Sequence, residues 1–384
     1  MRIKHIEITG FRNLRSVNLE IPHEGSFVVG MNGQGKTNFL EAIYYLGTLK
    51  SFRSSKDTEL VYFDAAHFRI VGRYRGNRGE GKIETAYDKK RKIVKINDVK
   101  EERISDAFGT LKVVLMTPDD VEMIQSHPSR RRRFIDIVLS MTSKNYLHDL
   151  TRYQAALRQR NTLLKNRGVK RSDVEVWDSQ MCKLAVDIVV RRSKFTDEFS
   201  AFYKESNSKL AGSPESTLCY VTSPKKAVTI LRDEGEKHLE NFYEAAFKNN
   251  HERDRELGVT TVGPHRDDLS IGLGERTMRS YGSQGQQRTS VFAMRMAEAR
   301  YIEERTGERP ILLMDDVFSQ LDLKRGNKLM ELVYDTHQTL ISTPRKGDTG
   351  FARQGMGMLL VKGGEITPEN QQGTTPSNTP RDVA

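Results

Sequence analysis

Apolar and polar residues alternate in short runs through the first third of the chain. The runs lie at residues 3–8, 17–21, 82–87 and 92–96, and a mainly apolar run, interrupted only by Lys112, follows at 111–116. Alternation with a period of two is typical of half-buried strands, whereas a short apolar run is typical of a fully buried strand. We therefore predict a strand-rich first part of the chain, with an antiparallel β subdomain inserted between Ala66 and Lys100.

The spacing of apolar residues becomes helical near residue 128. Heptad seam positions carry apolar side chains, and Arg160 stands in the one remaining place; the seam residues are Tyr146, Leu150, Tyr153, Leu157 and Leu164. A turn at 166–168 precedes a second seam that starts at Val174. Two seams joined by a short turn predict an antiparallel helical hairpin. Its first helix, from Ser129 to Arg167, would be roughly 58 Å long.

From about residue 260 the sequence again has a pattern typical of an α/β fold, with strand candidates at 310–315 and 338–342. We therefore predict an α/β fold with two lobes and a tail. The head lobe spans residues 1–120 and 255–366, the mainly helical arm lobe spans residues 121–254, and the tail spans residues 367–384. The tail is rich in Pro, Thr, Asn and Gln and lacks periodicity, so we expect it to be disordered.

The segment from Gly30 to Thr37 reads GMNGQGKT and matches a complete phosphate-binding loop. A strand-like run precedes it and a helix-like run follows, which is the context that this loop needs. Its glycines let backbone N–H groups turn towards phosphate oxygens, and the helix N-terminus adds its dipole. We expect Lys36 to act catalytically on the β- and γ-phosphates of ATP, and the Thr37 hydroxyl to bind Mg²⁺. The predicted nucleotide-binding residues here are Gly30, Met31, Asn32, Gly33, Gln34, Gly35, Lys36, Thr37 and Asn38.

Two acids, Asp315 and Asp316, end the apolar run at 310–315. An acid at the end of such a strand matches the Walker B residue, so we predict that Asp315 holds Mg²⁺. Asp316 stands where a catalytic carboxylate often polarises the attacking water. A solvated acidic pair at a strand end is the alternative. Hydrolysis should be slow, because Asp316 is one methylene shorter than the Glu that fast enzymes of this kind use.

A second motif of small residues, from Tyr281 to Gln287, precedes a helical pattern. Ser and Gly at a helix N-terminus form an anion site, and one chain rarely needs two γ-phosphate sites for one nucleotide. We therefore predict that Ser283 acts catalytically on ATP held by the other subunit of a dimer, with an ordinary helix cap as the alternative. The further residues predicted on this basis are Gly285 and Gln286 as nucleotide contacts, and Ser283, Gly285, Ser319 and Asp322 at the dimer interface.

Thr343 lies at the end of the strand candidate at 338–342, where a residue that senses the γ-phosphate would lie. It is therefore a predicted nucleotide contact. A threonine at a strand end is also ordinary, so a purely structural role remains open.

The chain is basic, with 62 Lys and Arg against 51 Asp and Glu, and residues 121–170 alone carry a net charge of +8. Such an excess favours a polyanionic partner. We predict contacts to DNA phosphates without base readout, because the segment contains no base-reading motif. A solvated helix face, or pairing with acids of the second helix, is the alternative. The candidate DNA-binding residues are Arg130, Arg131, Arg132, Arg133, Arg158 and Arg160.

Only two cysteines occur, Cys182 and Cys219, so we expect no disulfide framework. The first residues have no apolar signal core, and no run approaches the length of a membrane span. We therefore expect a cytoplasmic protein without membrane contact, which associates with the nucleoid when it is bound to DNA.

Together these motifs resemble the ABC-type P-loop ATPase heads of the SMC and Rad50 group, and within that group the RecF family of bacterial recombination mediators. The resemblance covers residues 1 to about 366 and rests on the segments Phe11 to Asn13, Gly30 to Ala42, Thr117 to Asp120, Arg131 to Phe134, Gly263 to Asp268, Gly282 to Gln287 and Leu313 to Asp322. Phe52 departs from the family pattern of Ser-His-Arg, but Arg53 is still predicted to approach the nucleotide. The glutamine loop has no clear counterpart, and residues 116–118 would have to serve.

The resemblance implies an ATP-dependent homodimer that binds double-stranded and gapped DNA and hydrolyses ATP weakly with Mg²⁺. It also implies a role with RecR and RecO in directing RecA loading, in recombinational repair and replication restart. The main alternative is an ABC transporter subunit, which would leave the basic helical arm without a role. Membrane co-fractionation would identify that class.

Overall fold

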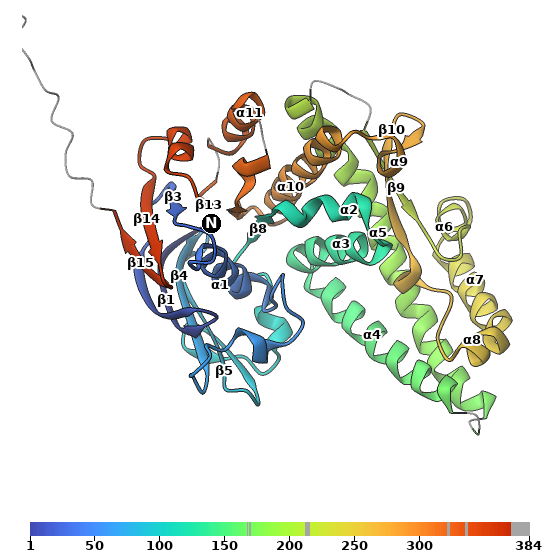
Figure 1. Ribbon diagram of the computed structural model, residues 1–384. Helices are drawn as coiled ribbons and strands as arrows, with labels where there is room; N and C mark the ends of the chain where they lie inside the picture. Colours follow the sequence, from blue (N-terminus) through green and yellow to red (C-terminus); the bar gives the residue numbers. More distant parts are fainter. Residues whose placement is uncertain (167, 169, 212–215, 321–322, 335–336, 370–384) are drawn as a thin grey trace, which may run out of the picture.

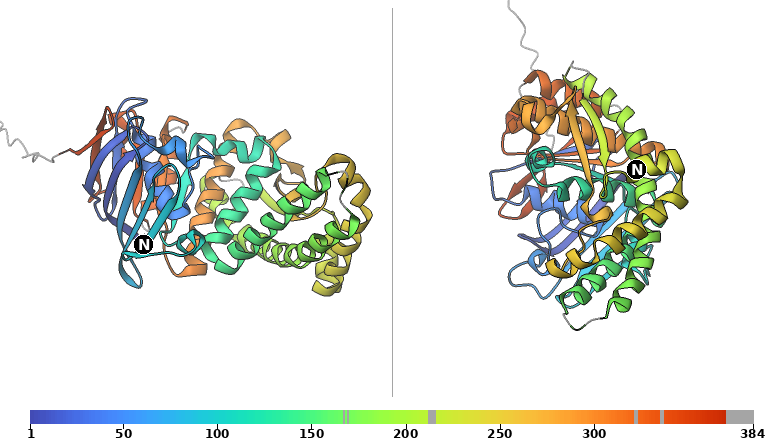
Figure 2. Two further views of the ribbon diagram at one scale, coloured as in Figure 1. Left: turned by 90° about the horizontal axis from the view of Figure 1, so that it is seen from below. Right: turned by 90° about the vertical axis from the view of Figure 1, so that its right-hand side faces the viewer.

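The computed structural model describes residues 1–369 apart from 167, 169, 212–215, 321–322 and 335–336. It has two lobes that lie side by side, one built on β-sheets and the other mainly helical (Figure 1). Figure 2 shows the two six-stranded sheets gathered at one end of the molecule and the long helices at the other.

The first sheet of the β-rich lobe is antiparallel throughout, in the order β2-β1-β4-β5-β6-β7. Its strands are β1 (Arg2–Phe11), β2 (Leu14–Glu20), β4 (Phe68–Gly76), β5 (Gly79–Tyr87), β6 (Lys92–Ile96) and β7 (Val99–Lys100). The alternating runs at 3–8 and 17–21 pair with each other, and the runs at 82–87 and 92–96 pair in the same way, as half-buried strands do. The predicted antiparallel subdomain is therefore confirmed.

The second sheet carries the phosphate-binding loop and has the order β15-β14-β3-β13-β12-β8. Its strands are β3 (Gly25–Val29), β8 (Val113–Met116), β12 (Ile311–Asp315), β13 (Thr339–Thr343), β14 (Gly357–Lys362) and β15 (Glu365–Pro368). All neighbours are parallel except β14 and β15. The helix α1 (Lys36–Thr48) contacts strands of both sheets, so the α/β head is confirmed. Because β15 includes residues 367 and 368, the predicted tail begins too early; residues 370–384 lie outside the described part of the chain.

The helical lobe is built around α3 (Pro128–Thr142), α4 (Lys144–Lys165) and α5 (Arg171–Ala211). The predicted single helix from Ser129 to Arg167 is wrong, because Ser143 has an extended backbone (φ −144°, ψ 111°). Its hydroxyl accepts a hydrogen bond from the Tyr146 N–H at 3.2 Å and so caps α4. The hairpin of α4 and α5 is confirmed, and its first seam is buried except for Leu157, which is half-buried.

Shorter helices complete the fold, and none of the described helices is long and apolar enough to cross a membrane. They are α2 (Glu122–Gln125), α6 (Ala227–Glu234), α7 (Glu236–Asn249), α8 (His251–Leu257), α9 (Met278–Tyr281), α10 (Gln284–Thr306) and α11 (Leu323–Tyr334). A third sheet, in the order β11-β10-β9, joins β9 (Ser216–Val221) to β10 (Asp268–Leu273) and β11 (Arg276–Thr277). It links segments from both sides of the boundary predicted near residue 254, and the boundaries themselves remain a prediction.

The segment before β10 forms a buried polar junction between α4, α5 and the third sheet. His265 donates through Nε2 to the Thr260 carbonyl at 3.0 Å and accepts at Nδ1 from the Tyr153 hydroxyl at 2.7 Å. Burial lowers the pKa of His265 to about 4, so the ring is neutral near pH 7. His265 therefore has a structural role in this junction.

Candidate nucleotide site

The phosphate-binding loop connects β3 to α1 as the sequence predicts. Gly33 and Gly35 have φ values of 78° and 121°, which favour glycine. A Cβ atom on Gly35 would lie 2.8 Å from the Asn13 Oδ1, so the close approach also requires glycine there. The Gly30 N–H donates to the Thr343 carbonyl at 3.3 Å, which ties the start of the loop to β13.

Lys36 lies at the start of α1 and folds over the loop. Its Nζ donates to the carbonyls of Gly30 and Met31 at 2.7 and 3.0 Å. Burial lowers the pKa of Lys36, and the nearby carboxylates of Asp316 and Asp315 oppose that shift. The ammonium group is thus held beside the concave side of the loop, where phosphate oxygens would lie.

Asp315, at the end of β12, meets the phosphate-binding loop. Its Oδ1 accepts hydrogen bonds from the Thr37 hydroxyl at 2.9 Å and from the Ser342 hydroxyl at 2.5 Å. Burial raises the pKa of Asp315, whereas these two hydroxyls lower it. The two predicted Mg²⁺ ligands, Thr37 and Asp315, are therefore in direct contact.

Asp316 follows in a left-handed backbone conformation, with φ at 48°. Its N–H donates to the Ser342 hydroxyl at 3.0 Å, and its buried Oδ1 accepts no hydrogen bond within the described part of the chain. A buried carboxylate oxygen without a partner suits a role with water or a ligand. Asp316 helps to line a cavity of about 300 Å³, together with Asn32, Gly33, Gly35, Lys36, Thr37, Asn38, Arg53 and Asp315.

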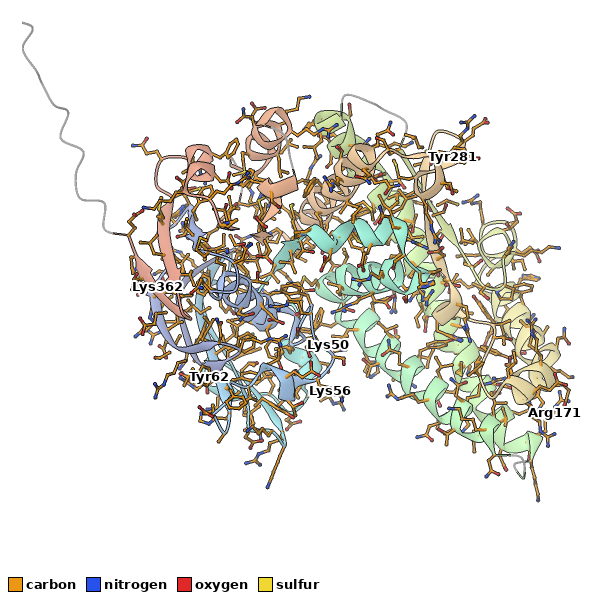
Figure 3. The ribbon with its side chains drawn as sticks, in the orientation of Figure 1. Lys50, Lys56, Tyr62, Arg171, Tyr281 and Lys362 are labelled. Atoms are coloured by element: carbon orange, nitrogen blue, oxygen red, sulfur yellow. The ribbon has the colours of Figure 1, made fainter. Side chains whose placement is uncertain are left out.

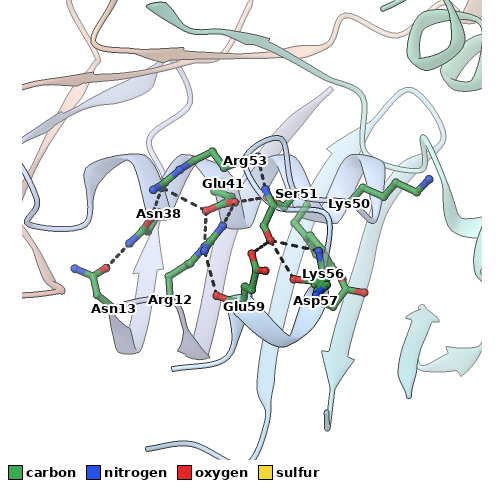
Figure 4. A network of polar contacts seen from close by, with 12 residues as sticks. Arg12, Asn13, Asn38, Glu41, Lys50, Ser51, Arg53, Lys56, Asp57 and Glu59 are labelled. Carbon is green, nitrogen blue, oxygen red and sulfur yellow. Dashed lines mark hydrogen bonds and ion pairs between the residues drawn. The ribbon is translucent and has the colours of Figure 1, made fainter. Parts of the chain in front are cut away.

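A buried carboxylate beside this cavity, Glu41, was missed by the sequence analysis (Figure 4). Arg12 donates two hydrogen bonds to the Glu41 carboxylate, at 3.0 Å from Nε and 2.9 Å from Nη2. Ser51 donates its hydroxyl to Glu41 at 2.5 Å, and Arg53 forms an ion pair with it at 3.6 Å. Arg53 also donates to the Asn38 Oδ1 at 2.7 Å, which brings it to the cavity as predicted. An acid among apolar residues of a helix was the available signal, because such a group must be paired when it is buried.

Ser283 caps α10 and lies away from the cavity of its own chain. Its Oγ accepts from the Gln286 N–H at 3.2 Å, and the Gln286 side chain accepts from the Ser283 N–H at 2.9 Å, which forms a capping box. Both side chains are exposed. Figure 3 places Tyr281 and Lys362 on opposite sides of the molecule, and the turn after Lys362 bonds to Gln34 of the loop. The sequence prediction that Ser283 does not serve the nucleotide of its own subunit fits this separation.

The predicted role of Thr343 is corrected by the structure. Its side chain is fully buried, and its hydroxyl donates to the Asp348 carboxylate instead of facing the cavity. The neighbouring Ser342 faces Asp315, because successive side chains of a strand point to opposite faces. Residues 116–118, expected to replace the glutamine loop, are not among those that line the cavity.

The predicted interface loop after Asp316 is only partly described. Ser319 is exposed, and its hydroxyl donates to the Asp316 carbonyl at 2.8 Å. Asp322 lies outside the described residues.

Comparisons with known proteins place the chain in a family. The family model for the RecF/RecN/SMC N terminal domain matches residues 2–367. The "DNA replication and repair protein RecF" of Bacillus subtilis (strain 168) is 35% identical over 373 residues, 95% of this chain and 100% of the relative. The protein of that name from Acetivibrio thermocellus is 38% identical over 351 residues, 90% and 94% of the two chains. The chain belongs to the RecF family.

Solved structures agree with this membership. The "recombination mediator protein RecF-ATPrS in RecFOR pathway" aligns with a TM-score of 0.87 at 30% identity, covering 96% of this chain and 98% of that one. The "recombination mediator protein RecF-ATP in RecFOR pathway" has a TM-score of 0.85, again at 30% identity and with 96% and 97% coverage. An Smc head bound to a domain of ScpA, at 15% identity and a TM-score of 0.55, shares the fold. The fold and the family are those of an ABC-type ATPase.

Two of the arginines predicted to bind DNA in this RecF-family chain are structural instead. Arg160 is fully buried and donates to Asp178 at 2.5 Å and to Asp254 at 2.7 Å, so it holds α4, α5 and α8 together. Arg131 is 6% exposed and forms a two-bond ion pair with Asp268, at 2.7 and 3.0 Å. Neither guanidinium can reach a DNA backbone, because burial and pairing leave it no free face.

The other four arginines remain available to different degrees. Arg158 is exposed, and Arg130 is exposed although it pairs with Glu122. Arg132 and Arg133 donate to backbone carbonyls of Asp267 and Ser51, at 2.7 and 3.0 Å. DNA contact by these four residues stays a prediction.

Proposed function

We propose that this chain is an ATP-operated DNA clamp of recombinational repair, in which ATP joins two heads and their basic surfaces hold DNA. The proposal is carried by the hydrogen bond between the Thr37 hydroxyl and the Asp315 carboxylate, which unites a phosphate-binding loop with a Walker B acid. The structural relatives described with ATP and with an ATP analogue support ATP as the nucleotide.

The residues present fit a nucleotide with Mg²⁺. Among the described residues, no three His, Cys, Asp or Glu cluster in a way that would hold a metal alone. Mg²⁺ in such sites takes one or two protein oxygens and completes its shell with water and phosphate oxygens. Thr37 and Asp315 would supply those oxygens, and the ion would neutralise charge on the phosphates.

The chain's own residues have distinct roles in this account. Lys36 neutralises phosphate charge, and Asp315 holds the Thr37 hydroxyl towards the metal position. Asp316 orients the attacking water with its unpartnered oxygen. Arg53 lies at the cavity beside Glu41, where it can meet phosphate oxygens. Ser283, with Gly285 and Gln286, completes the site of the partner subunit in the dimer.

DNA would lie against the basic arm of each subunit. Arg130, Arg132, Arg133 and Arg158 supply the phosphate contacts, because Arg131 and Arg160 are buried. Phosphate contacts position a duplex without reading its sequence. The relatives' link to the RecFOR pathway supports RecR and RecO as partners. We further propose that the chain helps to direct RecA loading at gapped DNA, in the cytoplasm and on the nucleoid.

We expect Asp316→Glu to raise the turnover number of ATP hydrolysis several-fold. The longer side chain brings its carboxylate closer to the attacking water, whereas Asp316 reaches less far. Steady-state phosphate release measures the effect, with Asp315→Glu as the matched control. That control should slow hydrolysis, since it disturbs the contact with Thr37. An unchanged or lower turnover for Asp316→Glu would show that reach does not limit the reaction.

The clamp proposal is tested by anisotropy of a labelled duplex, with and without ATPγS and Mg²⁺. Wild type should bind more tightly with the nucleotide, and Lys36→Ala should lose that gain because it loses phosphate contact. Four phosphate contacts per subunit give a slope of about −3.6 in log K against log salt, so fourfold more salt weakens binding at least about 100-fold. Equal binding with and without nucleotide would contradict the proposal.

A further inference from the structure

A second and larger cavity lies between the two lobes, away from the phosphate-binding loop. It has a volume of about 580 Å³, within the range of small-molecule sites. The head contributes the end of α1 and the segment from Lys50 to Asp57, and the arm contributes residues of α3, α4 and α5. In Figure 3, Lys50 and Lys56 lie on the side of the head that faces α4.

Three cations of this cavity have no carboxylate partner. They are Lys50, Arg132 and Arg133, and no ion pair joins any of them to an acid within the described part of the chain. The two arginines instead donate to the carbonyls of Asp267 and Ser51. A half-enclosed space lined by three such cations attracts an anion, because desolvated walls strengthen the field inside it.

The acids of the same cavity are already neutralised. Asp57 forms an ion pair with Lys92 at 2.8 Å, and Asp136 forms one with Arg192 at 2.8 Å. Asp136 also accepts a hydrogen bond from the Tyr146 hydroxyl at 2.5 Å. The carboxylates that act on Arg132 through space, those of Asp136, Asp267 and Asp268, are each paired with another arginine, so the cavity keeps a positive charge.

The remaining walls have the mixture of groups that a nucleotide needs. Hydroxyls of the lining can donate to phosphate oxygens, namely those of Ser55, Ser129 and Ser140. An apolar side is formed by Phe108, Ile137 and Leu147, against which a base can pack. Charge, hydroxyls and an apolar wall thus meet within one cavity.

We propose that this interlobe cavity is a second anion site, which binds a phosphorylated ligand of nucleotide size through Lys50, Arg132 and Arg133. The ligand is a nucleotide unit, either free or at the end of a DNA strand. The cavity is separate from the one at Lys36. Arg132 and Arg133 are also proposed DNA contacts of the clamp, whereas Lys50 is not, so Lys50→Glu tests the free-nucleotide form independently of the clamp. Only the DNA-strand form rests on the proposed function.

The test uses the full chain in two backgrounds that remove binding at the phosphate-binding loop: Lys36→Ala, and wild type saturated with ATPγS and Mg²⁺. The probe is 5′-phosphorylated dithymidylate with a 3′ fluorescein, followed by anisotropy. Lys50→Glu and Arg133→Glu should each weaken binding about tenfold or more, because a charged hydrogen bond is lost and a repulsion is added. Lys100→Glu, the same charge change on exposed β7 outside the cavity, should leave affinity within about twofold.

Competition then identifies the source of the ligand. If dTMP displaces the probe as well as the unlabelled dinucleotide does, the ligand is a free nucleotide. If the dinucleotide competes and dTMP does not, the ligand is the end of a DNA strand. Thymidine without phosphate should not compete. Competition by thymidine, or equal losses in Lys50→Glu and Lys100→Glu, would overturn the proposal. The clamp is tested separately, by ATP-dependent binding of the labelled duplex, prepared with 5′-hydroxyl ends. A failure of the second-site proposal is therefore distinguishable from a failure of the clamp proposal.

Discussion

Replacing Arg160 by alanine should lower the free energy of unfolding of the arm by about 3–5 kcal/mol. Arg160 is fully buried on α4, and its partner Asp254 is fully buried as well. Removing the guanidinium leaves Asp254 as an uncompensated charge and Thr260 without its 2.9 Å hydrogen bond. The loss is large because desolvation of the remaining carboxylate is no longer balanced by a partner.

The single tryptophan offers a local probe of this effect. Trp177 lies on α5 directly before Asp178, the second acid bound to Arg160. Its fluorescence as a function of urea concentration therefore reports the unfolding of the arm. Arg158→Ala is the matched control, since Arg158 is exposed on the same helix and should change stability by no more than about 0.5 kcal/mol. Equal midpoints for the two variants would show that the buried ion pair contributes nothing to the arm.

Ser283→Arg should abolish the ATP-dependent dimer and reduce hydrolysis by about 100-fold or more, while ATP binding stays intact. The side chain is exposed at the start of α10, and the residue is absent from the lining of its own chain's nucleotide cavity. An arginine there would obstruct the joining of two heads and remove a hydroxyl from the partner's site. Binding of a fluorescent ATP analogue and phosphate release measure the two properties separately.

The control for this variant is Ser283→Ala, which keeps the surface open but removes the helix cap. It should cost about 1 kcal/mol in stability and retain a weakened dimer. If Ser283→Arg hydrolysed ATP at the wild-type rate, Ser283 would act only as the cap of α10.

Local patterns predicted much of the head, and longer-range contacts did not follow from them. The loop from Gly30 to Thr37 and the acid Asp315 were found because each depends on a short run of residues beside one strand. The contact of Arg12 with Glu41 joins residues that are distant in sequence, so no local pattern reveals it. Its only sign was a charged residue inside an otherwise apolar helix.

Two errors have simple physical reasons. Thr343 was predicted at the nucleotide, but a shift of one residue along β13 reverses the face, and it is Ser342 that contacts Asp315. Arg160 was assigned to DNA because of its charge, although its position on the heptad seam between Tyr153 and Leu164 indicated burial. Position within the helical pattern was the better guide than charge.

A local signal also explains why the predicted helix from Ser129 to Arg167 is interrupted. Ser143 is a typical N-cap residue, and its hydroxyl bond to Tyr146 starts α4 as a separate helix. The break in the helix did not affect the predicted seam of the hairpin, because Tyr146 and Leu150 lie after the break and within α4.

The most direct test of the account is the molar mass of the wild-type chain in solution, measured by light scattering with and without ATP and Mg²⁺. The monomer mass is 43.9 kDa. The account predicts that the mass doubles when ATP is added, and that Ser283→Arg keeps the monomer mass while it still binds ATP. A wild-type chain that stays monomeric with saturating ATP would contradict the shared-nucleotide dimer.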